Sequence, residues 1–257
     1  MEFKNYTLYQ KAEDIKRLKF VSDHVSEKNS KQLEILDIGC GNGNISYQLA
    51  RSGFRVTGID ISEKTIMVAN ANFGATPGLQ FKVLNIEQFN PVESEKYDVI
   101  ICSEVLEHLT DPGRLVANFL KLLKTDGIAI VTVPNGFGPR EMVITKPLLQ
   151  IVKGESLVSR FALKIKYSLG YKGSTDQSSA DHLDHLQFFT MKKLSQLAQN
   201  NGFMITRKKS GDFIQNVFPF SFICRHFLFL QKFDCFIADI LPLAFTSQFY
   251  TVWKQRN

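Results

Sequence analysis

The chain has 257 residues, of which 44% are hydrophobic and 22% are charged, close to the averages for a globular protein. This length fits one large domain, or a core with a cap, and excludes disorder, collagen-like repeats and coiled coil as the main state. Residues 1–136 hold 15 Lys and Arg against 17 Asp and Glu, whereas residues 137–257 hold 16 against 8. The basic second half indicates an anionic partner or a solvated surface.

The cysteines indicate a reducing compartment, because they form no Cys-x-x-Cys pair and no zinc-ligand spacing; they are Cys40, Cys102, Cys224 and Cys235. The first 20 residues alternate charged with apolar side chains and hold no apolar signal-peptide core. No run reaches the roughly 18 apolar residues of a spanning helix. We therefore expect a cytoplasmic protein that does not cross a membrane.

The first 136 residues alternate β-rich runs with helical patterns, which predicts βαβ units around a parallel sheet. The five expected strands are Leu33–Ile38, Arg55–Ile59, Leu79–Leu84, Tyr97–Cys102 and Gly127–Val133. The expected helices are Tyr9–Ser26, Ile45–Arg51, Glu63–Phe73 and Asp111–Leu123. Asp111 followed by Pro112 is typical of a helix start, with a capping carboxylate and then Pro at the first position.

The second half begins with helical apolar spacing over residues 139–180 and no clear strand. A helix at Thr190–Asn200, with Thr190 as its cap, a strand at Phe203–Lys208 and a final edge strand at Phe249–Trp253 follow. We predict an α/β fold with a Rossmann-like doubly wound sheet of seven strands, mostly parallel with an antiparallel edge strand. The expected divisions are a core at 1–136, a helical cap after the fifth strand at 137–189, and completion of the sheet at 190–257.

The most informative motif is the strand Ile35–Ile38 followed by glycines at positions 39, 41 and 43. Glycine lets backbone amides approach a ligand closely, and the next helix directs its N-terminus at the same place. A dinucleotide fingerprint needs a third glycine where this chain has Asn44. The Asp37 carboxylate repels a pyrophosphate but suits a ligand with a cationic amino group.

The second strand ends at Asp60, 17 residues after Gly43, near the offset at which an acidic side chain binds ribose in doubly wound folds. Ile61 is placed to lie against an adenine face. Asn85 and Ile86 follow the third strand, where an amide can read the adenine edge. Adenosine with an amino-acid tail satisfies these features together, which indicates S-adenosylmethionine as the cofactor.

With these motifs the chain resembles the class I S-adenosylmethionine-dependent methyltransferases, and among them the small-molecule branch that includes the ubiquinone-biosynthesis O-methyltransferases. The resemblance is carried by LDIGCGNG (36–43), GIDIS (58–62), YDVIICSEVLEHLTDP (97–112) and LLKTDGIAIVTVPN (122–135), with a weaker match at HLQFFTMKKLSQLAQNNGF (185–203). It covers residues 30–135 strongly and 185–210 moderately. The cap and the Phe-rich tail carry no family motif.

The resemblance implies a set of cofactor-binding residues. Those around the methionine tail are Asp37, Gly39, Cys40, Gly41, Asn42 and Gly43. Asp60 holds the ribose, Ile61 lies against the adenine, and Asn85 with Ile86 lies near the adenine amine. The family often has Asp where Asn85 stands, and an amide keeps the role with less charge. Ser103 and Glu104 line the methyl-donor site.

His108, His185 and Glu104 are the candidate catalytic residues, because imidazole titrates near neutral pH and a hydroxyl acceptor must lose its proton. His182 and Asp184 are rivals of His185. Glu-x-x-Glu-His on a helical turn places Glu104 with Glu107 or His108 on one side. Some ubiquinone-pathway relatives are thought to bind a divalent metal through such a trio, but the same string occurs in relatives without metal. We therefore assign no metal site.

Ten of the 22 Phe residues lie between Phe213 and Phe249. They are typical of a core, of an apolar substrate pocket or of an interfacial patch. Cationic Arg225 and Lys232 and His226 interleave with Phe residues, a pattern that also fits a surface facing anionic lipid. Peripheral membrane contact is accordingly one expected partnership.

The sequence favours a methyltransferase acting on a small molecule, at the oxygen of an apolar or anionic acceptor such as a quinone-type phenol or a lipid or polysaccharide precursor. Two alternatives stay open: a nicotinamide-dependent oxidoreductase on the same fold, and a binding protein that keeps the cofactor but not catalysis. Nucleic acid is not an expected partner, because the chain has neither an Asn-Pro-Pro-Tyr tetrapeptide nor a basic run interleaved with stacking aromatics.

Overall fold

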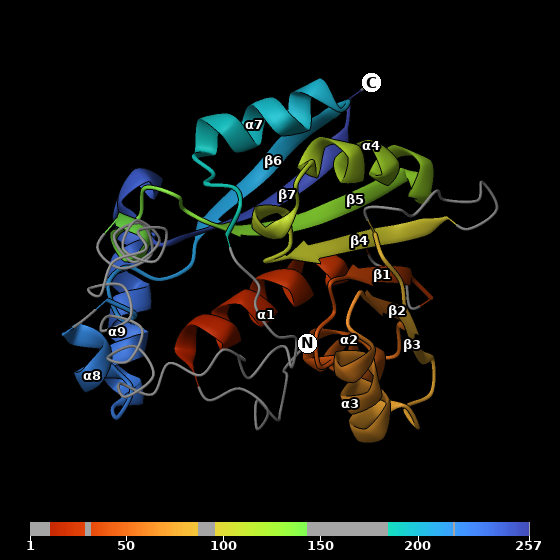
Figure 1. Ribbon diagram of the computed structural model, residues 1–257, viewed down its shortest axis with the longest axis horizontal. Coiled ribbons are helices and arrows are strands. Elements are labelled where there is room, and N and C mark those ends of the chain that lie inside the picture. Colours follow the sequence, from red (N-terminus) through yellow and green to blue (C-terminus); the bar gives the residue numbers. More distant parts are fainter. Residues whose placement is uncertain (1–10, 29–31, 87–95, 143–184, 218, 257) are drawn as a thin grey trace, which may run out of the picture.

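The fold is taken from a computed structural model that describes residues 11–28, 32–86, 96–142, 185–217 and 219–256. Seven strands form one sheet in the order β3-β2-β1-β4-β5-β7-β6 (Figure 1). The strands are β1 (Glu34–Ile38), β2 (Arg55–Asp60), β3 (Leu79–Val83), β4 (Tyr97–Ser103), β5 (Leu123–Pro134), β6 (Phe203–Ser210) and β7 (Gln248–Gln255). The sheet confirms the predicted Rossmann-like class.

The strand order changes direction between β1 and β4. β1 pairs in parallel with β2 on one side and with β4 on the other. In open α/β sheets, ligands bind outside the carboxyl ends of the strands at such a switch point. The end of β1, where Asp37 lies, is therefore the expected centre of a site.

β7 is the antiparallel strand of the sheet and pairs with both β5 and β6. The sequence placed Phe249–Trp253 at the edge, whereas the structure puts β7 one position inward and leaves β6 at the edge. Tyr250 and Trp253 are fully buried on this strand. These two residues belong to the cores on opposite faces of the sheet, so β7 contributes an aromatic side chain to each.

Helices cover both faces of the sheet (Figure 1). They are α1 (Ala12–Ser26), α2 (Asn44–Arg51), α3 (Glu63–Phe73), α4 (Pro112–Leu122), α7 (Met191–Asn200), α8 (Phe220–Cys224) and α9 (Leu228–Ile240), with short 3-10 helices η1 (Leu106–His108) and η3 (Leu243–Phe245). Ile100 belongs to a core shared with α4 and α7, and its neighbour Ile101 to a core shared with α1, α2 and α3. Because successive side chains of a strand point to opposite faces of the sheet, β4 contributes to the core on each face.

Helix starts follow the sequence signals. Asp111 precedes α4, and its carboxylate accepts a hydrogen bond from the backbone N–H of Arg114 at 3.2 Å. Thr190 caps α7 in the same way, through the N–H of Lys193 at 3.1 Å. These side chains satisfy backbone donors that the first turn leaves without partners. Both predicted caps are confirmed.

Most of the predicted cap, residues 143–184, lies outside the described residues. The four cysteines are free, as expected from their spacing. Within the described ranges, no helix combines the length and apolar character needed to cross a bilayer.

Candidate functional site

Asp37 is buried at the carboxyl end of β1 and faces the first turn of α2. Its Oδ2 accepts a hydrogen bond from the Ser46 hydroxyl at 2.6 Å. Burial raises the pKa of Asp37 to about 7; the Ser46 hydrogen bond opposes this shift and the nearby Asp60 carboxylate adds to it. Asp37 therefore changes charge near neutral pH, and a cationic partner favours its ionised form.

The loop after Asp37 depends on glycine because its backbone is left-handed at three positions. The φ angles of Gly39, Gly41 and Gly43 are 67°, 55° and 83°. A Cβ on Gly43 would lie 2.5 Å from Cζ of Phe81, which packs beneath the loop. Gly43 also precedes α2 without a capping side chain, so the N-terminus of this helix stays open to a ligand.

Asp60 joins the end of β2 to the glycine loop. Its Oδ2 accepts a hydrogen bond from the N–H of Gly41 at 3.0 Å, and its Oδ1 accepts one from the N–H of Ser62 at 2.9 Å. Each carboxylate oxygen has two lone pairs, so both can accept a further hydrogen bond from a diol. Ile61, the next residue, exposes 59% of its surface.

The other predicted cofactor residues surround this loop. The N–H of Leu84 bonds to the carbonyl of Asp60 at 2.9 Å, which brings Asn85 and Ile86 to the same sheet edge. Cys40 is buried, and burial raises the pKa of its thiol well above the ordinary value, so the thiol stays neutral. Asn42 is half-buried in the loop.

Ser103 is the last residue of β4 and Glu104 follows it, and both interact with β5. The Ser103 and Thr132 hydroxyls lie 2.9 Å apart, and the Thr132 hydroxyl donates to Oε1 of Glu104 at 3.0 Å. Glu104 has a φ of 57°, the only positive value at a non-glycine residue in the described ranges. Such a conformation is strained and is retained where surrounding contacts hold it.

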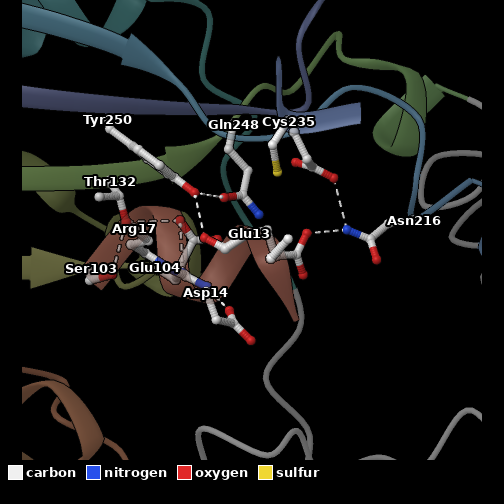
Figure 2. Close-up of polar contacts among 12 residues, drawn as sticks. Glu13, Asp14, Arg17, Ser103, Glu104, Thr132, Asn216, Cys235, Gln248 and Tyr250 are labelled. Atoms are coloured by element: carbon white, nitrogen blue, oxygen red, sulfur yellow. Dashed lines mark hydrogen bonds and ion pairs between the residues drawn. The ribbon is translucent and has the colours of Figure 1, made fainter. Parts of the chain in front are cut away.

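Arg17 from α1 reaches this position from across the sheet edge (Figure 2). Its guanidinium lies 2.6 Å from the Asp14 carboxylate and 3.7 Å from that of Glu104. Burial opposes the charge of Arg17, but Glu104 and Asp14 together raise its pKa. Glu104 therefore faces a permanent buried cation.

A second polar network lies beside the Arg17 network in Figure 2. The Asn216 side-chain amide donates to Glu13 on α1, and to Oδ2 of Asp212 at 2.8 Å. Burial, with the nearby Glu13 and Asp234 carboxylates, raises the pKa of Asp212 well above its usual range, and the hydrogen bond from Asn216 opposes this shift. The Tyr250 hydroxyl donates to Gln248 Oε1 at 3.0 Å and lies 3.3 Å from the carbonyl of Glu13. α1 is thus fixed to β7 and to the chain after β6 by buried polar contacts.

The structure brings His108 and His185 together. Their ring centroids are 5.1 Å apart in an edge-on arrangement. Both N–H groups of Leu186 and Gln187 donate to the carbonyl of Glu107, at 2.8 and 2.9 Å, which fixes the chain after His185 beside η1. Nδ1 of His185 lies 3.5 Å from the Glu141 carboxylate. His182 and Asp184, the rivals of His185, lie outside the described residues.

The predicted grouping of Glu104, Glu107 and His108 on one helical turn is wrong in part. η1 begins at Leu106, and the left-handed backbone at Glu104 sends its side chain toward Arg17 and Thr132 instead. Among the described residues, the potential ligand atoms within 4.8 Å of one another belong to Glu107, His108 and His185. His185 thus takes the place expected for Glu104.

One carboxylate and two imidazoles form a donor set found at transition-metal sites. Glu107 is buried, with Oε2 accepting no hydrogen bond, and its carboxylate lies 3.8 Å from Nε2 of His108. Burial, with a contribution from Glu104, raises the pKa of Glu107 well above its usual range. The three residues fit a cation chemically, but they also form ordinary carboxylate–histidine pairs.

Sequence reasoning missed Arg17, Ser46 and Glu141. Ser46 carried a weak signal, since it lies in the first turn of the helix that follows the glycine loop. Arg17 lies in a mixed run of charges on α1, and nothing local distinguishes it from exposed Lys19. Glu141 lies in the region expected to form the cap, where no motif was assigned.

The fold and the glycine loop together define the class of protein. A family model described as a methyltransferase domain matches residues 9–208, more than half of the chain. The chain therefore belongs to the methyltransferase-domain family, and the resemblance to class I S-adenosylmethionine-dependent methyltransferases is confirmed.

Curated relatives point to one branch of this family. The chain is 40% identical over 119 residues to a ubiquinone biosynthesis O-methyltransferase of Caulobacter vibrioides, covering 46% of this chain and 47% of that protein. A protein of the same name from Coxiella burnetii is 29% identical over 188 residues, covering 72% of this chain and 68% of that protein. The chain spans about half the length of the first of these relatives.

Solved structures share the fold at low identity. Magnesium protoporphyrin IX methyltransferase from Synechocystis, with S-adenosylhomocysteine bound, has a TM-score of 0.54 and 17% identity, covering 95% of this chain and 84% of that chain. A SAM-dependent methyltransferase from Methanosarcina mazei has a TM-score of 0.57 and 19% identity, covering 91% of this chain and 98% of that chain.

A first prediction separates loop packing from backbone strain. Gly43→Ala places a Cβ against Phe81, whereas Gly53→Ala, at a φ of 93°, meets nothing within 4 Å. Both carry a left-handed backbone penalty of about 1–2 kcal/mol. We expect Gly43→Ala to lower the free energy of unfolding by about 1–3 kcal/mol more, as overpacking does. Urea denaturation measures the difference, and equal losses would contradict the packing argument.

A second prediction concerns the buried ion pairs of α1. Arg17→Gln leaves the Glu104 and Asp14 carboxylates without their cation, and we expect a loss of about 3–5 kcal/mol in unfolding free energy. Lys19→Gln is the matched control, because Lys19 pairs with Asp23 on the same helix at 2.9 Å but in solvent. An exposed pair contributes below about 1 kcal/mol. Similar losses for the two variants in urea denaturation would show that burial of Arg17 has no special effect.

Proposed function

We propose that this protein transfers a methyl group from S-adenosylmethionine to a hydroxyl of a small molecule. The observation that carries the proposal is a pair of carboxylates beside the glycine loop. Asp37 is buried just before the loop, and Asp60, at the end of β2, accepts a hydrogen bond from the N–H of the loop residue Gly41. Two carboxylates oppose a pyrophosphate and suit a ligand with an ammonium group and a ribose diol. Relatives named O-methyltransferases support the same choice.

The cofactor residues divide by the part of the ligand they meet. Asp37 and the loop from Gly39 to Gly43 would hold the methionine tail. Asp60 would accept hydrogen bonds from the ribose, with exposed Ile61 against the adenine face. Asn85 and Ile86 would meet the adenine edge, and Ser103 would line the donor site beside Glu104.

S-adenosylmethionine supplies an electrophilic methyl group on a sulfonium. The chain's own residues must align the acceptor oxygen and receive its proton. His185 has the better arrangement for that task, because the Glu141 carboxylate, 3.5 Å from its Nδ1, would stabilise the imidazolium that forms when His185 takes the proton. His108, beside Glu107, is the second candidate base. Glu104, held by Arg17 and Thr132, would line the site as a charged group rather than take the proton.

The acceptor is proposed to be an apolar or amphipathic metabolite, a quinone-type phenol or a lipid or polysaccharide precursor. The names of the curated relatives favour the phenol. The net charge of +8 in residues 137–257, 16 basic against 8 acidic, favours an anionic group on it. For a divalent metal the sequence offered at most Glu104, Glu107 and His108, whereas the described residues bring the potential ligand atoms of Glu107, His108 and His185 together. The cytoplasmic location stays a prediction.

Calorimetric titration with S-adenosylhomocysteine and, separately, NAD tests the cofactor assignment. We expect micromolar binding of S-adenosylhomocysteine and none of NAD. Asp60→Ala removes the ribose acceptor and should weaken binding at least about tenfold, the effect of losing a charged hydrogen bond. Glu63→Ala, which removes an exposed carboxylate three residues further on, is the control and should bind normally.

Binding of NAD in place of S-adenosylhomocysteine would favour the oxidoreductase alternative. Binding of S-adenosylhomocysteine without methyl transfer to phenols, lipid precursors or polysaccharide precursors would favour the binding-protein alternative. Failure to bind either ligand would overturn the proposal.

The pKa of Asp37 gives a pH-dependent test. Its carboxyl is largely neutral at pH 6 and ionised at pH 8, because burial raises its pKa to about 7. An ammonium ligand binds the ionised form, so affinity for S-adenosylhomocysteine should rise about tenfold between these pH values. Asp37→Asn should be weak and independent of pH. Ser46→Ala removes the hydrogen bond that favours the carboxylate, so its profile should move to higher pH; an unmoved profile would contradict the assignment to Asp37.

A further inference from the structure

α9 has its polar side inward and its apolar side outward. Its buried residues are Gln231, Asp234, Cys235 and Ala238. Its exposed large side chains are Leu228, Phe229, Phe233, Phe236 and Ile240. A surface helix of a globular protein normally has the opposite arrangement, with an apolar stripe facing the core. The exposed Phe residues also exclude the core interpretation for most of the described Phe-rich tail.

The inverted orientation is fixed by polar contacts with the body of the protein. Gln231 Oε1 accepts a hydrogen bond from the N–H of Ala12 at 3.0 Å, and Lys16 Nζ donates to the carbonyl of Cys235 at 2.8 Å. The Asp234 carboxylate accepts hydrogen bonds from the N–H groups of Phe213 and Ile214 at 2.8 and 2.9 Å. Turning the Phe side chains inward would break all of these contacts.

α8 lies beside α9 at one end of the molecule (Figure 1), and α8, its junction with α9 and η3 also carry exposed apolar residues. We call this surface the α8–α9 face; its exposed large apolar residues are Phe220, Phe222, Ile223, Phe227, Leu228, Phe229, Phe233, Phe236, Ile240 and Phe245, each between 44% and 66% exposed. Scattered exposed apolar residues are ordinary, but a grouped set marks an interaction site.

The charges on this face are basic. Arg225, His226 and Lys232 are exposed, and the Arg225 guanidinium lies 4.4 Å from the ring centroid of Phe222. The acidic residues of α9 are Asp234, which is buried, and Asp239, which pairs with Lys16 at 2.9 Å. In the described residues of α8 and α9 the face therefore presents aromatic rings and cations, and the one exposed acid, Asp239, is paired with Lys16.

We propose that the α8–α9 face docks on the surface of an anionic lipid bilayer. Phe rings enter the boundary between headgroups and acyl chains, and Arg225 and Lys232 meet lipid phosphates. α9 has 13 residues, about 20 Å at 1.5 Å per residue, so it lies along the surface rather than across the membrane.

A second copy of the chain suits this face less well. A two-fold interface sets each patch against itself, which would bring Arg225 and Lys232 against the same cations without a compensating acid. The face lies beyond residue 208, outside the part of the chain that the family model matches.

Co-sedimentation of the full chain with lipid vesicles tests the proposal. We expect binding to vesicles of phosphatidylglycerol and phosphatidylcholine in about equal amounts, and at least about fivefold weaker binding to phosphatidylcholine alone, the effect of one cation near an anionic surface. The double variant Phe229→Asp, Phe233→Asp should lose more than about tenfold in binding. Met67→Asp is the matched control, because Met67 on α3 is 66% exposed, like Phe229.

Arg225→Gln with Lys232→Gln should remove the preference for phosphatidylglycerol while thermal unfolding stays unchanged. Unaltered vesicle binding by the Phe229→Asp, Phe233→Asp variant would overturn the proposal. So would a dimer in sedimentation velocity that this variant dissociates while the unmodified chain ignores both kinds of vesicle. These outcomes are independent of S-adenosylhomocysteine binding, so they do not depend on the proposed methyl transfer.

Discussion

The parallel pairing of β1 with both β2 and β4 is the constraint on which the rest of the structure depends. Parallel strands bring their carboxyl ends to one edge, so residues far apart in sequence meet there without further design. Asp37 and Asp60 lie at the carboxyl ends of β1 and β2, and the turn at Glu104 follows β4. The parallel pairing of these three strands thus brings the candidate cofactor-binding residues together.

α1 places a buried cation, Arg17, at the same edge of the sheet. A guanidinium that is always ionised is costly to bury alone, but Arg17 lies between the Asp14 and Glu104 carboxylates. The left-handed backbone of Glu104 turns its carboxylate toward that cation. A strained residue at the end of β4 and an unusual buried Arg are therefore two parts of one arrangement.

Local signals in the sequence were sufficient for the strands, the capped helices and the glycine loop, because each depends on neighbours within a few residues. Thr190 and Asp111 cap the helices they precede. Features that depend on residues far apart in the sequence could not be predicted from it. The inner position of β7, the burial of Arg17 and the left-handed backbone at Glu104 depend on tertiary contacts. The outward side of α9 was also hidden, because helical periodicity is the same whether the apolar stripe faces in or out.

Lys16 and Arg17 are consecutive residues of α1 with different partners. Lys16 bonds to the carbonyl of Cys235 and to Asp239 on α9, whereas Arg17 pairs with Glu104 at the end of β4. One turn of α1 therefore contacts both the α9 helix of the α8–α9 face and the left-handed turn at Glu104. A tilt of α1 would disturb both sets of contacts at once, so a displacement of α9 that moved α1 would also disturb the ion pair between Arg17 and Glu104.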